Sequence, residues 1–342
     1  MAEFVRGAEL AQAFYQEVVR PVLGGTTHAA ALLGTGSDVL GFDTSRSTDH
    51  GWGPRMHVFV DEANLTDVAS RVDAALPDTY QGWPTRYGWD AVPVQHHVVV
   101  RPLGAWLRSQ LGVDPREGMS TVDWLAAPQQ KLLEVTAGPV FHDGTGELAR
   151  TRSILSWYPD DVWRWLVACQ WRRLDQEEPF VGRTAEVGDE LGSSIVAARL
   201  ARDLMRLCLL LDRRYAPYSK WLGSAFARLD IAATVGPALE AALAASAFRE
   251  REAALVEAFR FVARHHNEAG ASQPVSADVS PFYGRPYQVL GSGRFVDACL
   301  DRVQDPWLRS LPLVGAIDQL VDSTDVLEHP TVSRRLLSMY VR

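Results

Sequence analysis

The most constraining feature of this chain is a glycine-serine turn set between two short apolar runs. Residues 29–33 form the first run, the Gly34–Ser37 turn follows, and residues 56–60 are typical of a buried strand. Glycine lets backbone N–H groups approach an anion closely, and a helix that began after Ser37 would add favourable partial charge. Asp49, just before the second strand, could hold Mg²⁺ against the same anion. This order of residues predicts a phosphate site backed by a metal carboxylate.

The spacing resembles the signature of the nucleotidyltransferase superfamily, in which Gly-Ser is followed about a dozen residues later by Asp-x-Asp/Glu. Here eleven residues separate Ser37 from Asp49. Together with residues 41–43 and 49–55, Gly36-Ser37 is also similar to an uncharacterised bacterial family, DUF4037, distantly similar to aminoglycoside and streptomycin nucleotidyltransferases. The resemblance implies a nucleotidyltransferase-like fold, with an NTP as co-substrate and Mg²⁺ as cofactor. It further implies that Gly36 and Ser37 contact the triphosphate and that Asp49 binds the metal.

One position departs from the superfamily pattern. Where a second carboxylate is expected, two residues after Asp49, the chain has Gly51. A two-metal phosphoryl-transfer site needs two or three carboxylates around its ions, and a single one makes a weak magnesium site. Asp43 is an alternative second carboxylate, although an Asx-turn with Ser45 is equally compatible with its position.

The general base is expected on a later strand, because the third superfamily carboxylate usually lies there. The matching strand, residues 95–100, offers His96 and His97 instead, and imidazole can accept a proton near neutral pH. Asp143, before a Gly-Thr-Gly turn, is the other candidate. For each of them a purely structural role remains an alternative.

Several cations and aromatic residues could complete the site. Arg46 and Arg55 flank Asp49, and either could contact phosphate or form a salt bridge. Lys220, in a Tyr-x-Pro-Tyr-x-Lys-Trp run that also resembles the DUF4037 pattern, could offset phosphate charge that develops during transfer. Tyr218 and Trp221 of the same run could shape the acceptor pocket, or simply pack at a corner between helices.

Hydrophobic periodicity predicts two domains. Strands and helices alternate over residues 1–150, which indicates an α/β domain with a nucleotidyltransferase-like mixed sheet, and long helical patterns dominate residues 151–342, which indicates an α-helical bundle that closes the cleft. Expected strands are 29–33, 56–60 and 92–101, residues 139–148 are expected to form a strand and a turn, and residues 82–90 read as a turn-rich aromatic segment. Expected helices are 4–19, 65–76, 103–111, 124–135, 160–174, 191–214, 231–247, 253–267, 294–303 and 313–321.

The amino-acid composition limits the kinds of ligand and the cellular location that we expect for this protein. A formal net charge of −8 argues against a nucleic-acid polymer as substrate and suits a small, cationic acceptor better. No apolar run approaches membrane-helix length, and the charged N-terminal residues do not resemble a signal peptide. The three cysteines lack metal-site spacing and are expected to be reduced core residues in a cytoplasmic protein.

These features predict a protein that transfers a nucleoside monophosphate from an NTP to a hydroxyl of a small molecule. In that scheme Asp49 holds Mg²⁺, His97 or Asp143 takes the acceptor proton, and Arg46 and Lys220 face the phosphates. The alternative is a catalytically degenerate relative that binds a nucleotide or metabolite in a regulatory role, and Gly51 is the residue that favours it.

Overall fold

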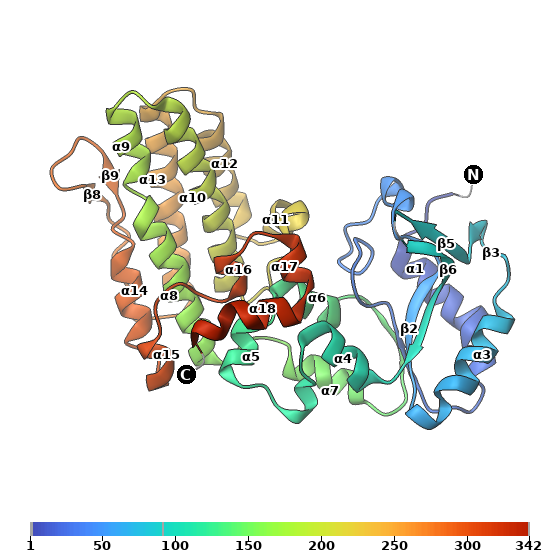
Figure 1. The fold of residues 1–342 in the computed structure, drawn as a ribbon. Helices are drawn as coiled ribbons and strands as arrows, with labels where there is room; N and C mark the ends of the chain where they lie inside the picture. The colour runs from blue at the N-terminus through green and yellow to red at the C-terminus, as the bar shows by residue number, and fades with distance from the viewer. Residues whose placement is uncertain (1–2, 91, 341–342) are drawn as a thin grey trace. The chain divides into compact units, whose positions relative to one another are not determined.

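The computed structural model describes residues 3–90 and 92–340, which form a mixed α/β protein (Figure 1). Contacts divide the chain into two compact units, which do not coincide with the predicted boundary at residue 150. The first comprises residues 1–120, 130–156 and 328–331, and the second comprises residues 121–129, 157–327 and 332–342. Among the described residues, no helix combines the length and the apolar character that crossing a membrane requires.

The first unit is built on a five-stranded mixed sheet in the order β5-β6-β2-β1-β7. β2 and β6 run parallel, whereas β1 is antiparallel to both β2 and β7, and β5 is antiparallel to β6. The strands are β1 Ala29–Ala31, β2 Arg55–Phe59, β3 Thr79–Tyr80, β4 Trp83–Pro84, β5 Arg86–Trp89, β6 Val92–Arg101 and β7 Val140–Asp143. The helices are α1 Gly7–Phe14, α2 Arg20–Leu23, α3 Leu65–Ala75, α4 Leu103–Leu111, α6 Gln129–Thr136 and α7 Glu147–Ile154, with a π-helical turn at Tyr15–Val19 and 3-10 turns at Ser45–Asp49, Glu62–Asn64 and Pro115–Glu117.

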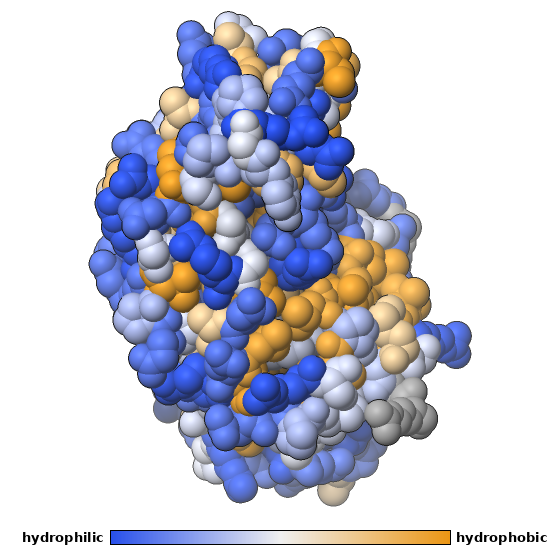
Figure 2. Space-filling view, turned by 90° about the vertical axis from the view of Figure 1, so that its left-hand side faces the viewer, coloured by the Kyte–Doolittle hydropathy of each residue, from blue (hydrophilic) through white to orange (hydrophobic). Residues whose placement is uncertain are grey.

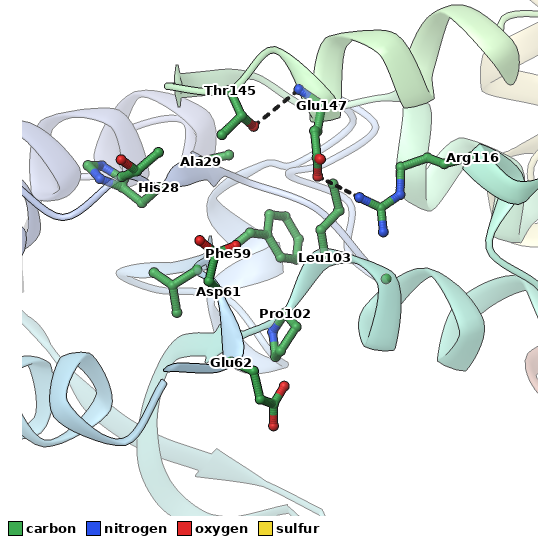
Figure 3. Close-up of a pocket in the computed structure, with 13 residues that line it drawn as sticks. His28, Ala29, Phe59, Asp61, Glu62, Pro102, Leu103, Arg116, Thr145 and Glu147 are labelled. Atoms are coloured by element: carbon green, nitrogen blue, oxygen red, sulfur yellow. Dashed lines mark hydrogen bonds and ion pairs between the residues drawn. The ribbon is translucent and has the colours of Figure 1, made fainter. Parts of the chain in front are cut away.

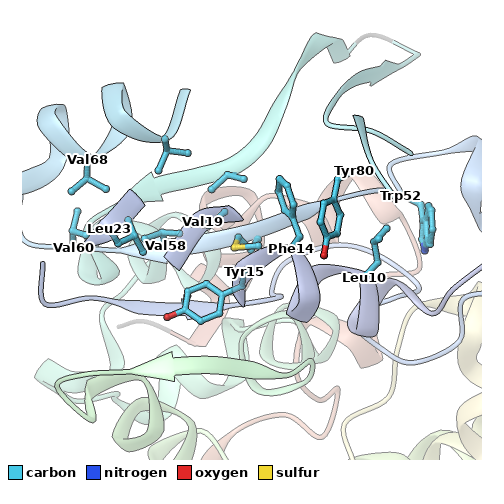
Figure 4. Close-up of a cluster of buried hydrophobic side chains, with 14 residues drawn as sticks. Leu10, Phe14, Tyr15, Val19, Leu23, Trp52, Val58, Val60, Val68 and Tyr80 are labelled. Atoms are coloured by element: carbon cyan, nitrogen blue, oxygen red, sulfur yellow. The ribbon is translucent and has the colours of Figure 1, made fainter. Parts of the chain in front are cut away.

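Apolar side chains pack on both faces of the sheet. On one face, Phe14 of α1 and Val68 of α3 pack against Val58 of β2 in a fully buried cluster (Figure 4). On the other face, Trp106 of α4 contacts the rings of His57 and Phe59. Residues of one strand alternate between the two faces, so Arg55, His57 and Phe59 share the α4 face.

The second unit is mostly helical. Its helices are α5 Thr121–Ala126, α8 Asp160–Glu177, α9 Phe180–Glu186, α10 Glu190–Leu211, α11 Ser219–Phe226, α12 Ala232–Ala244, α13 Phe248–Ala269, α14 Gly293–Leu300, α15 Pro306–Ser310 and α16 Ile317–Leu320, and a short hairpin joins β8 Ser280–Pro281 to β9 Gln288–Val289. α17 Thr324–Glu328 and α18 Pro330–Leu336 follow, with a final 3-10 turn at Leu337–Tyr340. Figure 2 shows one largely hydrophilic face with interspersed hydrophobic side chains, and the exposed apolar residues of this unit include Val187, Leu191 and Ile195.

Most predicted elements are confirmed, and four differ for identifiable reasons. The helix expected over 124–135 is broken between α5 and α6 at Pro128, which has no N–H to donate. The first helix continues past Pro21, because a π-helical turn precedes it and places proline in the first turn of α2. Residues 82–90 contain β4 and β5 rather than turns alone. Within residues 313–321 only Ile317–Leu320 is helical.

Candidate functional site

The Gly34–Ser37 turn follows β1 directly and has little free space. Gly34 and Gly36 have φ angles of +84° and +152°, a range that favours glycine. A Cβ on Gly36 would lie 2.2 Å from both Arg55 Nη2 and Asp38 Oδ1, so only glycine fits beneath this ion pair. No helix follows Ser37: its carbonyl accepts a hydrogen bond from Phe42 N at 2.8 Å in a non-helical turn. The expected helix-dipole contribution to anion binding is therefore missing.

A buried ion pair holds the turn against β2. Arg55, the first residue of β2, donates from Nε and Nη2 to the two carboxylate oxygens of Asp38, at 2.8 and 2.6 Å, and from Nη2 to the carbonyl of Thr35 at 2.9 Å. The Asp38 side chain is 2% exposed and the Arg55 side chain 14% exposed. Burial by itself would lower the pKa of Arg55, but the charge and hydrogen bonding of Asp38, with smaller contributions from Tyr87 and Glu134, together raise it. The guanidinium group is therefore fixed at the turn.

Glu134 of α6 fixes the same turn from another direction. Its carboxylate accepts a hydrogen bond from Thr35 Oγ1 at 3.1 Å, and its backbone carbonyl accepts one from Gly34 N at 2.9 Å. Lys131 Nζ lies 2.8 Å from the Glu134 carboxylate, and both side chains are buried. The arrangement of the Gly34–Ser37 turn with Asp38, Arg55, His57, Tyr87, His97 and Glu134 is called the glycine-serine corner below.

Three rings of the sheet contribute polar atoms to this corner. His97 of β6 pairs with Arg55 in the parallel ladder, and its ring contacts that of Tyr87 in a tilted arrangement with ring centroids 4.3 Å apart. His97 Nε2 lies 2.9 Å from the Tyr87 carbonyl and must donate to it, which leaves Nδ1 as the proton acceptor. Burial lowers the pKa of His97 and raises that of Tyr87. Burial, together with the positive charges of Arg55 and Arg101, lowers the pKa of His57 to about 3, so its imidazole is neutral.

Asp49 ends an exposed 3-10 turn that also carries Arg46. Within residues 3–90 and 92–340, the Asp49 carboxylate makes no hydrogen bond or ion pair, so it is free to bind a ligand. The residues that follow connect this turn to the corner. Gly51, at φ +64°, packs against the indole of Trp89, whose ring centroid lies 4.9 Å from that of His97. These contacts link Gly51 to the corner through Trp89 and His97, and none of them involves the Asp49 side chain.

The carboxylates present do not form the magnesium site that the resemblance implies. Asp43 is 2% exposed and accepts hydrogen bonds from Gly7 N at 2.7 Å, from Trp52 Nε1 at 3.2 Å and from Arg6. Asp38 is fully engaged by Arg55. Among the described residues, no group of three or more His, Cys, Asp or Glu side chains is arranged to hold a metal ion. Asp38 and Asp43 are therefore held by protein donors and are not available as the second carboxylate.

The remaining predicted site residues lie elsewhere in the fold. Asp143 pairs with Ala29, at the opposite end of β1 from the Gly34–Ser37 turn, and its Oδ2 accepts a hydrogen bond from Ala149 N at 2.8 Å in the first turn of α7. The sheet therefore does not bring Asp143 to the corner. Lys220, Tyr218 and Trp221 belong to the second unit.

Within that unit, Tyr218 is the N-cap residue of α11. The exposed Lys220 ammonium lies 5.1 Å from the ring centroid of Trp221.

A cavity of about 270 Å³ lies at that opposite edge of the sheet (Figure 3). Phe59 and Leu103 contribute apolar surface, and the surrounding charged residues include Glu62 and an ion pair between Arg116 and Glu147 at 2.5 Å. None of the predicted site residues lines it.

Part of the chain matches a known protein family. Residues 124–222 match the family model described as Domain of unknown function (DUF4037). This confirms, for that segment, the resemblance seen in the sequence. No curated protein matches the chain. A solved structure, described as a nucleotidyltransferase-like protein from Exiguobacterium sibiricum 255-15, shares 12% identity over 77% of both chains with a TM-score of 0.33. So low a TM-score carries no argument about the site.

Sequence reasoning identified the turn but missed most of what surrounds it. Glu134 lies ninety-nine residues from its partner Thr35, and no local pattern connects them. The sequence pattern predicts turns around Tyr87 and a buried strand at His57, and it does not indicate that either residue lies near the glycine-serine turn. Arg55 was considered for phosphate contact or a salt bridge, and the salt bridge is present.

Proposed function

We propose that this chain is a nucleotidyltransferase-like protein, with a sheet domain and a helical bundle, that binds the phosphate chain of a nucleotide at the glycine-serine corner. The observation that carries the proposal is the Gly34–Ser37 turn, which Arg55 and Glu134 hold in place through hydrogen bonds to Thr35. Gly36 and Ser37 are partly exposed beside a fixed guanidinium group, and the exposed Asp49 carboxylate makes no hydrogen bond or ion pair with the described residues. Backbone of this kind, beside a fixed cation, suits an anionic ligand.

Transfer chemistry is impaired in this proposal. The second carboxylate is absent at Gly51, and the two nearest alternatives, Asp38 and Asp43, are buried and occupied by protein donors. We therefore favour a protein that binds a nucleotide or a related phosphorylated metabolite as a regulator over an efficient transferase.

The second candidate function is slow transfer of a nucleoside monophosphate to a small hydroxyl acceptor. Asp49 supports it because the carboxylate is free, and His97 supports it because its Nδ1 can accept a proton. In this version Arg46, on the same 3-10 turn as Asp49, keeps its predicted role with the phosphates.

A two-part experiment tests both candidates. Thermal shift with each of the four common NTPs, with and without Mg²⁺, tests binding, and pyrophosphate release over a panel of aminated and neutral hydroxyl compounds tests transfer. Stabilisation without pyrophosphate release supports the binding function, and release that requires an acceptor supports transfer. No stabilisation by any nucleotide would count against both.

A further inference from the structure

The cavity of about 270 Å³ at the far end of the sheet from the Gly34–Ser37 turn takes no part in the proposed function (Figure 3). All of its lining residues belong to the first unit, so one compact body forms it. It lies where the parallel strands β2 and β6 reach their carboxyl ends, which is where open α/β sheets commonly bind ligands. Its volume is slightly below the roughly 300–1,000 Å³ of pockets for drug-sized molecules, so it suits a small metabolite.

One part of the lining is apolar. Phe59, the last residue of β2, and Leu103, the first residue of α4, border the space together with Pro102 (Figure 3). The Phe59 ring is held from behind by the rings of His57 and Trp106, with centroids 5.8 and 5.3 Å away. Packing therefore fixes an apolar wall that can contact the carbon skeleton of a ligand.

The positive charge beside the cavity is already neutralised by the protein. Arg116 donates from Nε and Nη2 to the Asp114 carboxylate, at 3.0 and 2.7 Å, and from Nη1 to Glu147 at 2.5 Å. Asp114 also covers the first turn of α4, because its Oδ2 lies 2.7 Å from the position that a Cβ on Gly104 would take. The guanidinium group and this helix N-terminus are thus both matched to protein carboxylates, which disfavours an anionic ligand.

Negative charge, in contrast, is in excess around the cavity. Asp61 is the N-cap residue of the 3-10 turn Glu62–Asn64, where an aspartate ordinarily accepts a backbone hydrogen bond, but its side chain makes none. No described residue donates to the Asp61 or Glu62 carboxylate or forms an ion pair with it. His28 adds no positive charge, because burial lowers its pKa. Three of the four ionised residues in the lining are therefore acidic, and two of those have no protein partner.

The form of the cation follows from the same lining. Among the described residues, no group of three or more His, Cys, Asp or Glu side chains is arranged to hold a metal ion, so these carboxylates are too dispersed to coordinate one. An ammonium group on a small apolar body matches both parts of the cavity. Its charge can bind to the Asp61 carboxylate while its carbon skeleton covers Phe59 and Leu103.

We propose that this cavity is a second ligand site, which binds a small organic ammonium ion through the Asp61 carboxylate and the apolar wall of Phe59 and Leu103. The site lies at the opposite end of β1 from the glycine-serine corner, because Ala29 at the start of β1 lines it and the Gly34–Ser37 turn follows the end of β1. Binding here requires no nucleotide, so the proposal does not depend on the proposed function.

Ligand-observed NMR titration of the full chain at neutral pH tests the proposal with probes of one shape and different charge. Benzylamine is the cation, benzyl alcohol the neutral analogue and benzoate the anion, and methylammonium carries the charge without the ring. Asp61→Asn is the central variant, because it removes the charge of a side chain that makes no hydrogen bond within the fold. Asp78→Asn, at an exposed aspartate of the same unit that does not line the cavity, is the matched control.

We expect benzylamine to bind with a Kd of about 1 mM, and the other three probes to bind more weakly. The affinity for benzylamine should fall about 3- to 10-fold in Asp61→Asn, as the loss of one partly exposed charge contact predicts, and should not change in Asp78→Asn. Benzyl alcohol or benzoate binding as tightly as benzylamine, or equal benzylamine affinities in Asp61→Asn and the wild type, would overturn the proposal. The absence of benzylamine binding at about ten times the expected Kd would overturn it as well.

Discussion

Restoring the missing carboxylate with Gly51→Asp should give a folded protein with a stronger response to Mg²⁺. Gly51 has a φ of +64°, and a Cβ there would approach carbon atoms of the Trp89 ring to 3.4 Å, an ordinary van der Waals contact. The cost is therefore mainly that of left-handed backbone, about 1 kcal/mol, since Asp is among the residues that tolerate this conformation best. For a chain of 342 residues that corresponds to a loss of about 1–2 °C in Tm.

The gain should appear only when metal and nucleotide are present together. The new carboxylate would lie two residues after Asp49, so the two acids could share a cation where a single one holds it weakly. Thermal shift with ATP should become dependent on Mg²⁺, and pyrophosphate release should rise above that of the wild type. Gly51→Asn is the matched control, because asparagine must adopt the same left-handed backbone conformation as aspartate but adds no charge.

Two results would refute this reasoning. If Gly51→Asp and Gly51→Asn both fail to fold, the left-handed backbone at this position is more demanding than the geometry indicates. If both variants fold and respond to Mg²⁺ exactly as the wild type does, position 51 does not face the cation that Asp49 would bind, and the comparison with two-carboxylate sites is wrong.

The remaining predictions concern stability. His266 accepts from Trp171 Nε1 at 3.0 Å and bonds the Ser272 hydroxyl at 2.8 Å, and burial lowers its pKa to about 4. The unfolded chain takes up a proton near pH 6.5 and the folded chain does not, so stability is full above pH 6.5 and falls by about 3 kcal/mol as the pH approaches 4. Urea unfolding should show the difference between wild type and His266→Asn shrinking over this range, and a constant difference would contradict the assignment. Asp43→Ala should cost about 2–4 kcal/mol in the same assay because it leaves a buried amide and an indole unpaired, whereas Asp49→Ala should change stability by less than about 0.5 kcal/mol. Equal costs would contradict the division between a structural and an exposed aspartate.

Elements set by local pattern were predicted well from the sequence. Residues 103–111 have helical apolar spacing and form α4 with the same bounds, and residues 92–101 form β6 as predicted. No helix follows Ser37, where one would have added favourable partial charge to the turn. Gly41, at φ +67°, turns the chain out of a helical path. Local patterns thus fail where a glycine or proline redirects the backbone.

The candidate site was predictable only in outline. The Gly34–Ser37 turn was visible because glycine and serine are adjacent in sequence. The pairing of Arg55 with Asp38, and of Thr35 with Glu134, depends on which strands and helices become neighbours. No periodicity encodes those distances, so tertiary structure was needed to identify the groups that surround the turn.

The most direct test of the central claim is a crystal structure of the full chain with a non-hydrolysable ATP analogue. The account predicts phosphate oxygens beside the Gly34–Ser37 turn, within hydrogen-bonding distance of the Arg55 guanidinium group. Phosphates bound elsewhere, for example in the cavity beside Phe59 and Leu103, with the corner unchanged, would contradict it.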